Sequence, residues 1–143
     1  MSFSLERYFR HTGTRFRAYA QSPVLADFNE PETITVSSPL GSVGPGPSDI
    51  RMYVLMPQAK SPYGDADLPP FRGGVRPPVM PGPGGHFDHI VPSDPAFAAT
   101  NMFAVVRRVL DVCEIYAGGP IQWHFAGTHR RLEMIPEVPW DNA

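Results

Sequence analysis

The sequence predicts one α+β domain, in which a small antiparallel sheet packs on one long amphipathic helix and extended segments rich in proline and glycine surround them. Three observations lead to this class. Residues 94–125 have the apolar spacing and end signals of a helix followed by a strand, and short alternating segments elsewhere indicate further strands. The 143 residues suffice for one core, while 18 prolines and 13 glycines indicate that part of the chain lacks regular structure.

Residues 1–32 are predicted to form an N-terminal arm of aromatic and basic residues that docks on its own domain or on a partner. Residues 33–37 and 50–56 alternate like strands. A β-hairpin over residues 33–56 is the simplest pairing, because strands close in sequence pair antiparallel without a crossover. Residues 57–93 read as a Pro/Gly-rich extended segment, which is expected either to lie over the chain's own core or a neighbour, or to be free coil.

Residues 94–143 are predicted to hold a helix near 95–117 and a two-stranded unit. Asp94 suits the N-cap because its carboxylate can accept from the first-turn amides, and Pro95 suits the first helical position. The glycines at 118–119 supply a left-handed exit. The predicted buried stripe is Met102, Val105, Val106, Val109, Leu110, Cys113 and Tyr116, and the residues predicted to face solvent are Asn101, Arg108, Asp111 and Glu114.

Two short strands are expected after the helix, over residues 121–125 and 131–135. Alternation places Trp123 in the core. Trp140 lies where little chain remains to cover it, so it is assigned to a partner surface. Cys113 lies on the predicted buried stripe and is expected to be a buried, unreactive thiol.

Residues 86–143 follow an order that resembles a known family. A helix, a turn, a strand with a tryptophan, a second strand and a final Asn-Ala pair resemble the N-terminal, non-catalytic lobe of thermolysin-like zinc metallopeptidases, including the fungalysin-type relatives. In that family the segment ending in Asn-Ala is an edge strand whose asparagine holds the substrate backbone. The resemblance therefore implies a substrate-binding role for Asn142 and Ala143.

The zinc-binding part of that family's site is missing from this sequence. The family binds zinc through a downstream HExxH helix, whose two histidines hold the metal and whose glutamate activates water. No HExxH occurs in the 143 residues. The chain is therefore expected to be a truncated piece, a separately encoded lobe, or a relative that kept the scaffold and lost the chemistry.

His86, Asp88 and His89 are the most metal-like group of side chains, because imidazole and carboxylate both bind zinc or iron. The glycines at 84–85 and Pro92 indicate a loop there, so the spacing does not suit chelation from a helix. A polar turn leading into the helix is the favoured interpretation, and a metal site is the alternative. No cofactor is expected, and no serine lies in a strand-turn-helix elbow that would make it a nucleophile.

Net charge and hydropathy argue against two kinds of partner, nucleic acid and membranes. The net charge of −2 gives no overall attraction to nucleic acid or to an anionic membrane, and no apolar run is long enough to cross a bilayer. The N-terminus lacks the apolar run of a secretion signal, so a cytoplasmic protein is expected.

Two functions follow as hypotheses. The first is a non-catalytic scaffold or protein-interaction subunit, which acts through its Pro-rich arms and through exposed aromatic residues toward a protein partner or a second copy. The second is the substrate-binding lobe of a zinc peptidase whose catalytic segment lies on another chain or was lost. The residues selected as interface candidates are Tyr8, Phe9, Phe71 and Trp140.

Overall fold

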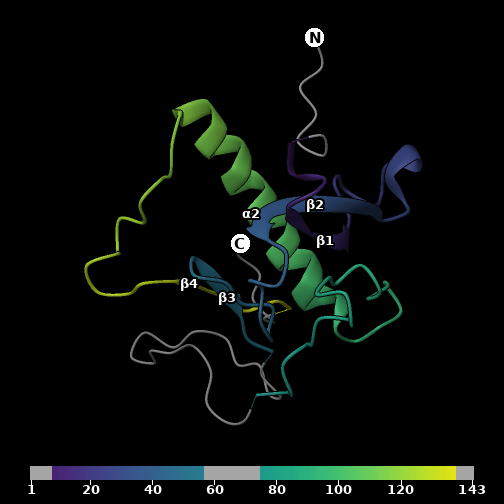
Figure 1. The fold of residues 1–143 in the computed structure, drawn as a ribbon. Helices are drawn as coiled ribbons and strands as arrows, with labels where there is room; N and C mark the ends of the chain where they lie inside the picture. Colours follow the sequence, from purple (N-terminus) through teal and green to yellow (C-terminus); the bar gives the residue numbers. More distant parts are fainter. Residues whose placement is uncertain (1–7, 57–74, 138–143) are drawn as a thin grey trace.

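The computed structural model describes residues 8–56 and 75–137, which form an α+β fold (Figure 1). The predicted class is confirmed: one long helix packs against a small antiparallel sheet, and it also contacts a second, parallel sheet. Within these residues no helix is both long and apolar enough to span a membrane. In chain order the elements are β1 (Gly13–Ala18), the 3-10 helix η1 (Ala26–Phe28), β2 (Glu32–Pro39), β3 (Met52–Val54), α2 (Phe97–Ala117) and β4 (Leu132–Met134).

Strands β1 and β2 form the antiparallel sheet, which makes part of the predicted N-terminal arm a core element. Phe16 of β1 lies opposite Ile34 of β2, and both are buried. The register shifts beside Gly13, where a Cβ atom would lie only 2.1 Å from the carbonyl oxygen of Val36. Residues 13–18 of the predicted arm therefore dock on the chain's own domain, which was one of the two arrangements expected. They do so as a strand whose arginines alternate with inward-facing residues.

The predicted hairpin over residues 33–56 does not form. β2 pairs with β1, whereas β3 pairs in parallel with β4, so that Tyr53 lies opposite Glu133, 80 residues further along the chain. Loop length alone favours a hairpin, but one edge of β2 is taken by β1 and the other by side chains of α2. The loop between β2 and β3 folds on itself instead, with the amide of Gly44 donating to the carbonyl of Ser48 at 2.8 Å.

Three phenylalanines from distant parts of the chain form the centre of the core. The ring of Phe16 stacks on that of Phe87 at 5.1 Å and on that of Phe103 in α2 at 5.4 Å, and all three are fully buried. Phe87 belongs to the Pro/Gly-rich segment, and its amide donates to the carbonyl of Arg15 in β1. The described part of that segment therefore lies on the chain's own core, which was one of the arrangements expected for it.

Helix α2 begins two residues later than predicted and ends where predicted. Ala96 occupies the N-cap position, and no side chain caps the helix there. The carboxylate of Asp94 accepts from the Ala96 amide at 2.8 Å, so it stabilises the turn ahead of the helix instead of the helix itself. Gly118 has a φ of 73°, and its amide and that of Gly119 donate to carbonyls of the last turn. The predicted glycine exit is confirmed.

The side of α2 that faces the core differs from the predicted one. Leu110 is buried as predicted, and Met102, Val105 and Val106 of the predicted stripe pack partly buried against the core. Val109 and Tyr116, however, keep 57% and 88% of their surface exposed, and Cys113, expected to be buried, is exposed too. Asp111, expected to face solvent, is only 2% exposed. The helix is apolar on two sides, and the side with its phenylalanines meets the sheet because those large side chains bury the most apolar surface. The buried residues of α2 are Phe97, Ala99, Thr100, Phe103, Ala104, Arg107, Leu110 and Asp111.

The strand predicted over residues 131–135 is confirmed as β4, whereas the one predicted over 121–125 is wrong. Residues 121, 123 and 125 are half-buried between exposed neighbours, so their burial alternates as expected, but they pair with no strand in the described chain. Trp123 packs against the core and is half-buried, and its indole N–H donates to the carbonyl of Arg51 at 3.0 Å.

Candidate functional site

Four residues selected from the sequence lie outside the described residues. They are Asn142 and Ala143, proposed to bind substrate, and Phe71 and Trp140, proposed to bind a partner. Their roles stay predictions.

His86 and Asp88 are both engaged with Arg15 of β1. The Arg15 amide donates to His86 Nδ1 at 3.1 Å, and Arg15 Nε lies 2.7 Å from Asp88 Oδ2. Burial lowers the pKa of His86, and the Arg15 guanidinium lowers it further while Asp88 opposes the change. This favours the neutral imidazole, the form in which Nδ1 can accept a bond. His89 is exposed.

These contacts fasten the segment before α2 to β1. Within residues 8–56 and 75–137, no group of three or more His, Cys, Asp or Glu side chains lies close enough to hold a metal ion. In the structure, His86 and Asp88 hold this segment to β1 beside the stacked rings of Phe16 and Phe87.

Tyr8 and Phe9 lie at the edge of the described chain. Their rings meet edge to face with centroids 5.1 Å apart. Tyr8 is 68% exposed and Phe9 is half-buried, and the carbonyl of Phe9 accepts from the Thr12 amide at 3.1 Å. Tyr8 thus offers aromatic surface to solvent, as its proposed interface role requires.

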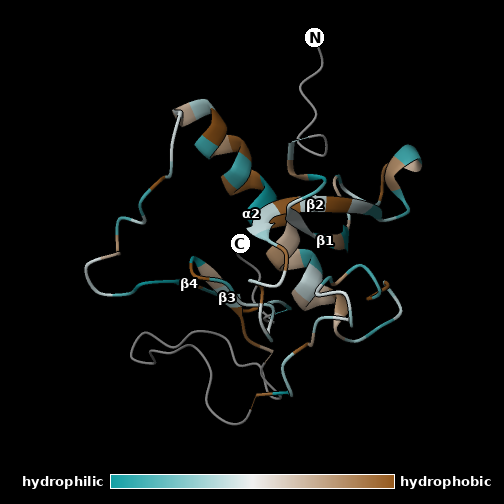
Figure 2. Cartoon of the chain, in the orientation of Figure 1, coloured by the Kyte–Doolittle hydropathy of each residue, from teal (hydrophilic) through white to brown (hydrophobic). Residues whose placement is uncertain are grey.

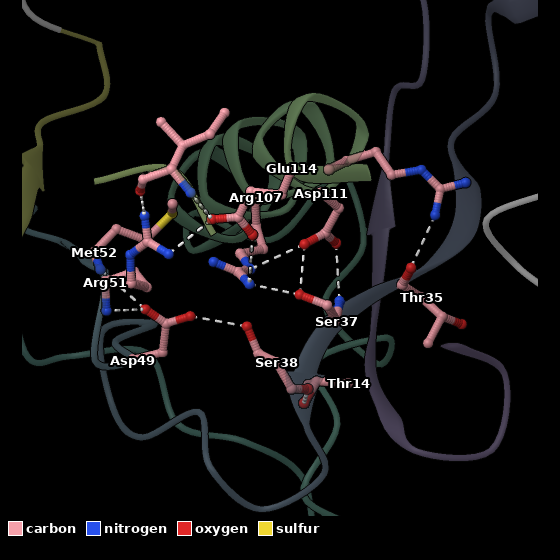
Figure 3. A network of polar contacts seen from close by, with 12 residues as sticks. Thr14, Thr35, Ser37, Ser38, Asp49, Arg51, Met52, Arg107, Asp111 and Glu114 are labelled. Atoms are coloured by element: carbon pink, nitrogen blue, oxygen red, sulfur yellow. Dashed lines mark hydrogen bonds and ion pairs between the residues drawn. The ribbon is translucent and has the colours of Figure 1, made fainter. Parts of the chain in front are cut away.

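A buried polar network joins α2 to the outer edge of β2 (Figure 3). Asp111 Oδ2 accepts from the Ser37 amide at 2.9 Å, and Asp111 Oδ1 accepts from the Ser37 hydroxyl at 2.5 Å. Arg107 Nη2 donates to Ser37 Oγ at 2.5 Å, and Arg107 Nε lies 3.3 Å from Asp111 Oδ1. Arg108 donates to the carbonyl of Thr35 at 2.9 Å. Side chains of α2 therefore bond the outward backbone groups of β2, which would otherwise be an open sheet edge.

Glu114, one turn further along α2, extends the network to β3. Glu114 Oε1 lies 2.8 Å from Arg51 Nη1 and accepts from the Ile121 amide at 3.1 Å, while Arg51 also donates to the Ile121 carbonyl. Arg107 Nη2 lies 4.0 Å from Glu114 Oε2, which connects the two groups of charges. The side chains of Arg51 and Glu114 are 19% and 17% exposed, so this ion pair is largely screened from water.

Asp49 fixes the turn that leads into β3. Its Oδ1 accepts from the amides of Arg51 and Met52 at 2.7 and 2.9 Å, and its Oδ2 accepts from the Ser38 hydroxyl at 2.8 Å. The carboxylate thus holds the start of β3 against the end of β2.

Asp111 is the buried carboxylate at the centre of this network. Burial raises the pKa of Asp111, while its hydrogen bonds from Ser37 and the charge of Arg107 oppose that rise. The Ser37 hydroxyl lies between this carboxylate and the Arg107 guanidinium, and the two hydrogen bonds hold its oxygen in place.

Arg107 is the member of the network whose burial is least compensated. Its Nε and Nη1 are buried without a hydrogen-bond partner among the described residues. An unpaired buried donor costs about 1–3 kcal/mol. Arg107 was not selected from the sequence, because charges on a helix ordinarily face solvent, and Ser37 was not selected because no motif surrounds it. The signal that could have found Arg107 is its spacing of four residues from Phe103, which puts both on one side of α2.

The loop after α2 combines aromatic rings with basic residues. The rings of Trp123 and Phe125 stack with centroids 5.7 Å apart, and the Arg51 guanidinium lies 5.3 Å from the centre of the Trp123 ring. Residues 115–132 include no Asp or Glu. The basic residues of this loop, all exposed, are His124, His129, Arg130 and Arg131.

The side of α2 opposite the network is apolar. Ala98, Met102 and Val105 on this side pack partly buried against the core, whereas its residues in the C-terminal half of the helix are mostly exposed. Its residues recur three or four apart, as on one side of a helix. Figure 1 shows the C-terminal half of α2 projecting beyond the β1–β2 sheet, and Figure 2 shows hydrophobic positions along that half. Four of the residues are half-buried, and the other three are exposed. We call this set the outward stripe: Ala98, Met102, Val105, Val109, Val112, Cys113 and Tyr116.

Comparison with protein-family models, with curated proteins and with solved structures found no match. The resemblance of residues 86–143 to a zinc-peptidase lobe therefore stays a prediction.

Proposed function

We propose that this chain is a non-catalytic protein-interaction subunit that binds another protein through the outward stripe of α2. The observation that carries this proposal is the orientation of the helix. Val109 and Tyr116 are exposed, whereas Asp111, on the opposite side, is buried. Full burial of a valine side chain stabilises a protein by about 1.5–3 kcal/mol, and burial of a carboxylate is costly unless it is paired. A helix that buries its charged side and exposes its apolar side is therefore expected in a protein whose apolar side is covered by a partner.

The continuity of the outward stripe supports the same proposal. Single exposed apolar residues are common on protein surfaces and need no explanation. Here the exposed residues Val109, Cys113 and Tyr116 follow one side of the C-terminal half of α2. The two carboxylates of that helix, Asp111 and Glu114, both turn inward to hydrogen-bond partners. Contiguous apolar surfaces of this kind mark interaction sites.

Site-specific photo-crosslinking tests the proposal. We expect benzoylphenylalanine in place of Val109 or Tyr116 to give a crosslinked species of one defined mass when the full chain is expressed in its source cells. The partner is then identified by mass spectrometry, purified and titrated with the purified chain. Val109→Glu should weaken that binding at least tenfold, because it puts a charge into an apolar contact.

Val24 provides the matched control, since it is also apolar and is 90% exposed but lies before η1, away from the outward stripe. A crosslinker at Val24 should give no such species, and Val24→Glu should leave the binding unchanged. If correctly folded protein gives no defined crosslink at Val109 or Tyr116, or if Val109→Glu binds the purified partner as tightly as wild type, the proposal is wrong.

A further inference from the structure

We draw no further inference here: the strongest candidate, the exposed apolar patch of Val109, Cys113 and Tyr116 on the C-terminal half of α2, belongs to the surface already described, and nothing in the described part of the chain shows what kind of partner covers it.

Discussion

The two halves of α2 are held to the same body by different interactions. The N-terminal half inserts Phe103 between apolar neighbours and stacks it on Phe16. The C-terminal half faces inward with Arg107, Asp111 and Glu114, which bond β2, β3 and the following loop. Within one helix, the identity of the neighbouring element decides which side chains are buried. Where α2 faces aromatic rings, it buries phenylalanine, which packs on them. Where it faces an open strand edge, it buries charged groups, which hydrogen-bond to the backbone of that strand.

This difference also explains why the apolar stripe of the C-terminal half is left outside. The inward side is fixed by the phenylalanines of the first half and continues along the helix with its own periodicity. In the second half that side carries arginine and carboxylates, and the valines lie opposite. This orientation leaves apolar surface of α2 exposed, which is unfavourable. The hydrogen bonds that the buried network makes to backbone groups offset this cost.

Replacing Phe103 tests the apolar half and should have the largest effect. Phe103→Ala removes a fully buried ring from the three-phenylalanine stack and is expected to lower the free energy of unfolding by about 3–5 kcal/mol. Chemical denaturation measures the loss. Tyr116→Ala is the control on the outward side of the same helix, where a change within about 0.5 kcal/mol is expected because Tyr116 is 88% exposed. Equal losses in both variants would contradict the assignment of inward and outward sides.

Replacing Arg107 tests the charged half. Arg107→Met leaves the buried carboxylate of Asp111 without its guanidinium and is expected to cost about 3 kcal/mol at pH 7. Arg10→Met, at an exposed arginine, should change stability by no more than about 0.5 kcal/mol. A cost of the Arg107 variant as small as that of the control would show that the buried pair contributes little.

The pH dependence of the same variant identifies Asp111 as the cause. Burial already raises the pKa of Asp111, and the charge of Arg107 opposes that rise, so Arg107→Met should raise the pKa further. An acid with a raised folded-state pKa is more stable folded while protonated, and this stability is lost as pH rises from the unfolded value of about 3.9 through the folded value. The cost of Arg107→Met should therefore be smaller near pH 4 than at pH 7. A cost that does not change with pH would exclude Asp111.

The His86 contact should give the smallest effect. Burial lowers the pKa of His86, and its neutral Nδ1 accepts from the Arg15 amide. The stability that this contact adds is fully present above the unfolded pKa of about 6.5 and is lost as pH falls through the lowered folded value. His86→Asn keeps an acceptor but cannot titrate, so it should remove this pH dependence. Proton NMR of the imidazole and of the Arg15 amide measures it, and a His86 pKa at or above 6.5 would contradict the contact.

Features that depend on local sequence could be predicted for this fold. The glycine exit of α2, the strand at residues 33–37 and the short strand at 131–135 follow from signals within a few residues of each element, and all three are found. The hairpin and the inward side of α2 could not be predicted in this way. They depend on contacts such as Tyr53 with Glu133, 80 residues apart, and Ser37 with Asp111, 74 residues apart.

The buried network was out of reach of the sequence for a further reason. Arg107, Asp111 and Glu114 have the spacing of an ordinary solvated helix side, and only the position of β2 shows that they lie inside. The valines of the outward stripe have the spacing of an ordinary buried side. Both patterns were visible in the sequence, and the choice between them required the tertiary structure.

The parallel pairing of β3 with β4 has a consequence for synthesis of the chain on the ribosome. β1 and β2 can pair once residue 39 has been made, but Tyr53 has no strand partner in β4 until the chain has grown by another 80 residues. At typical translation rates of about 5–20 residues per second, this interval is about 4–16 s. Throughout that time Met52 and Val54, which end up in the core, have to stay soluble without the strand that will cover their edge.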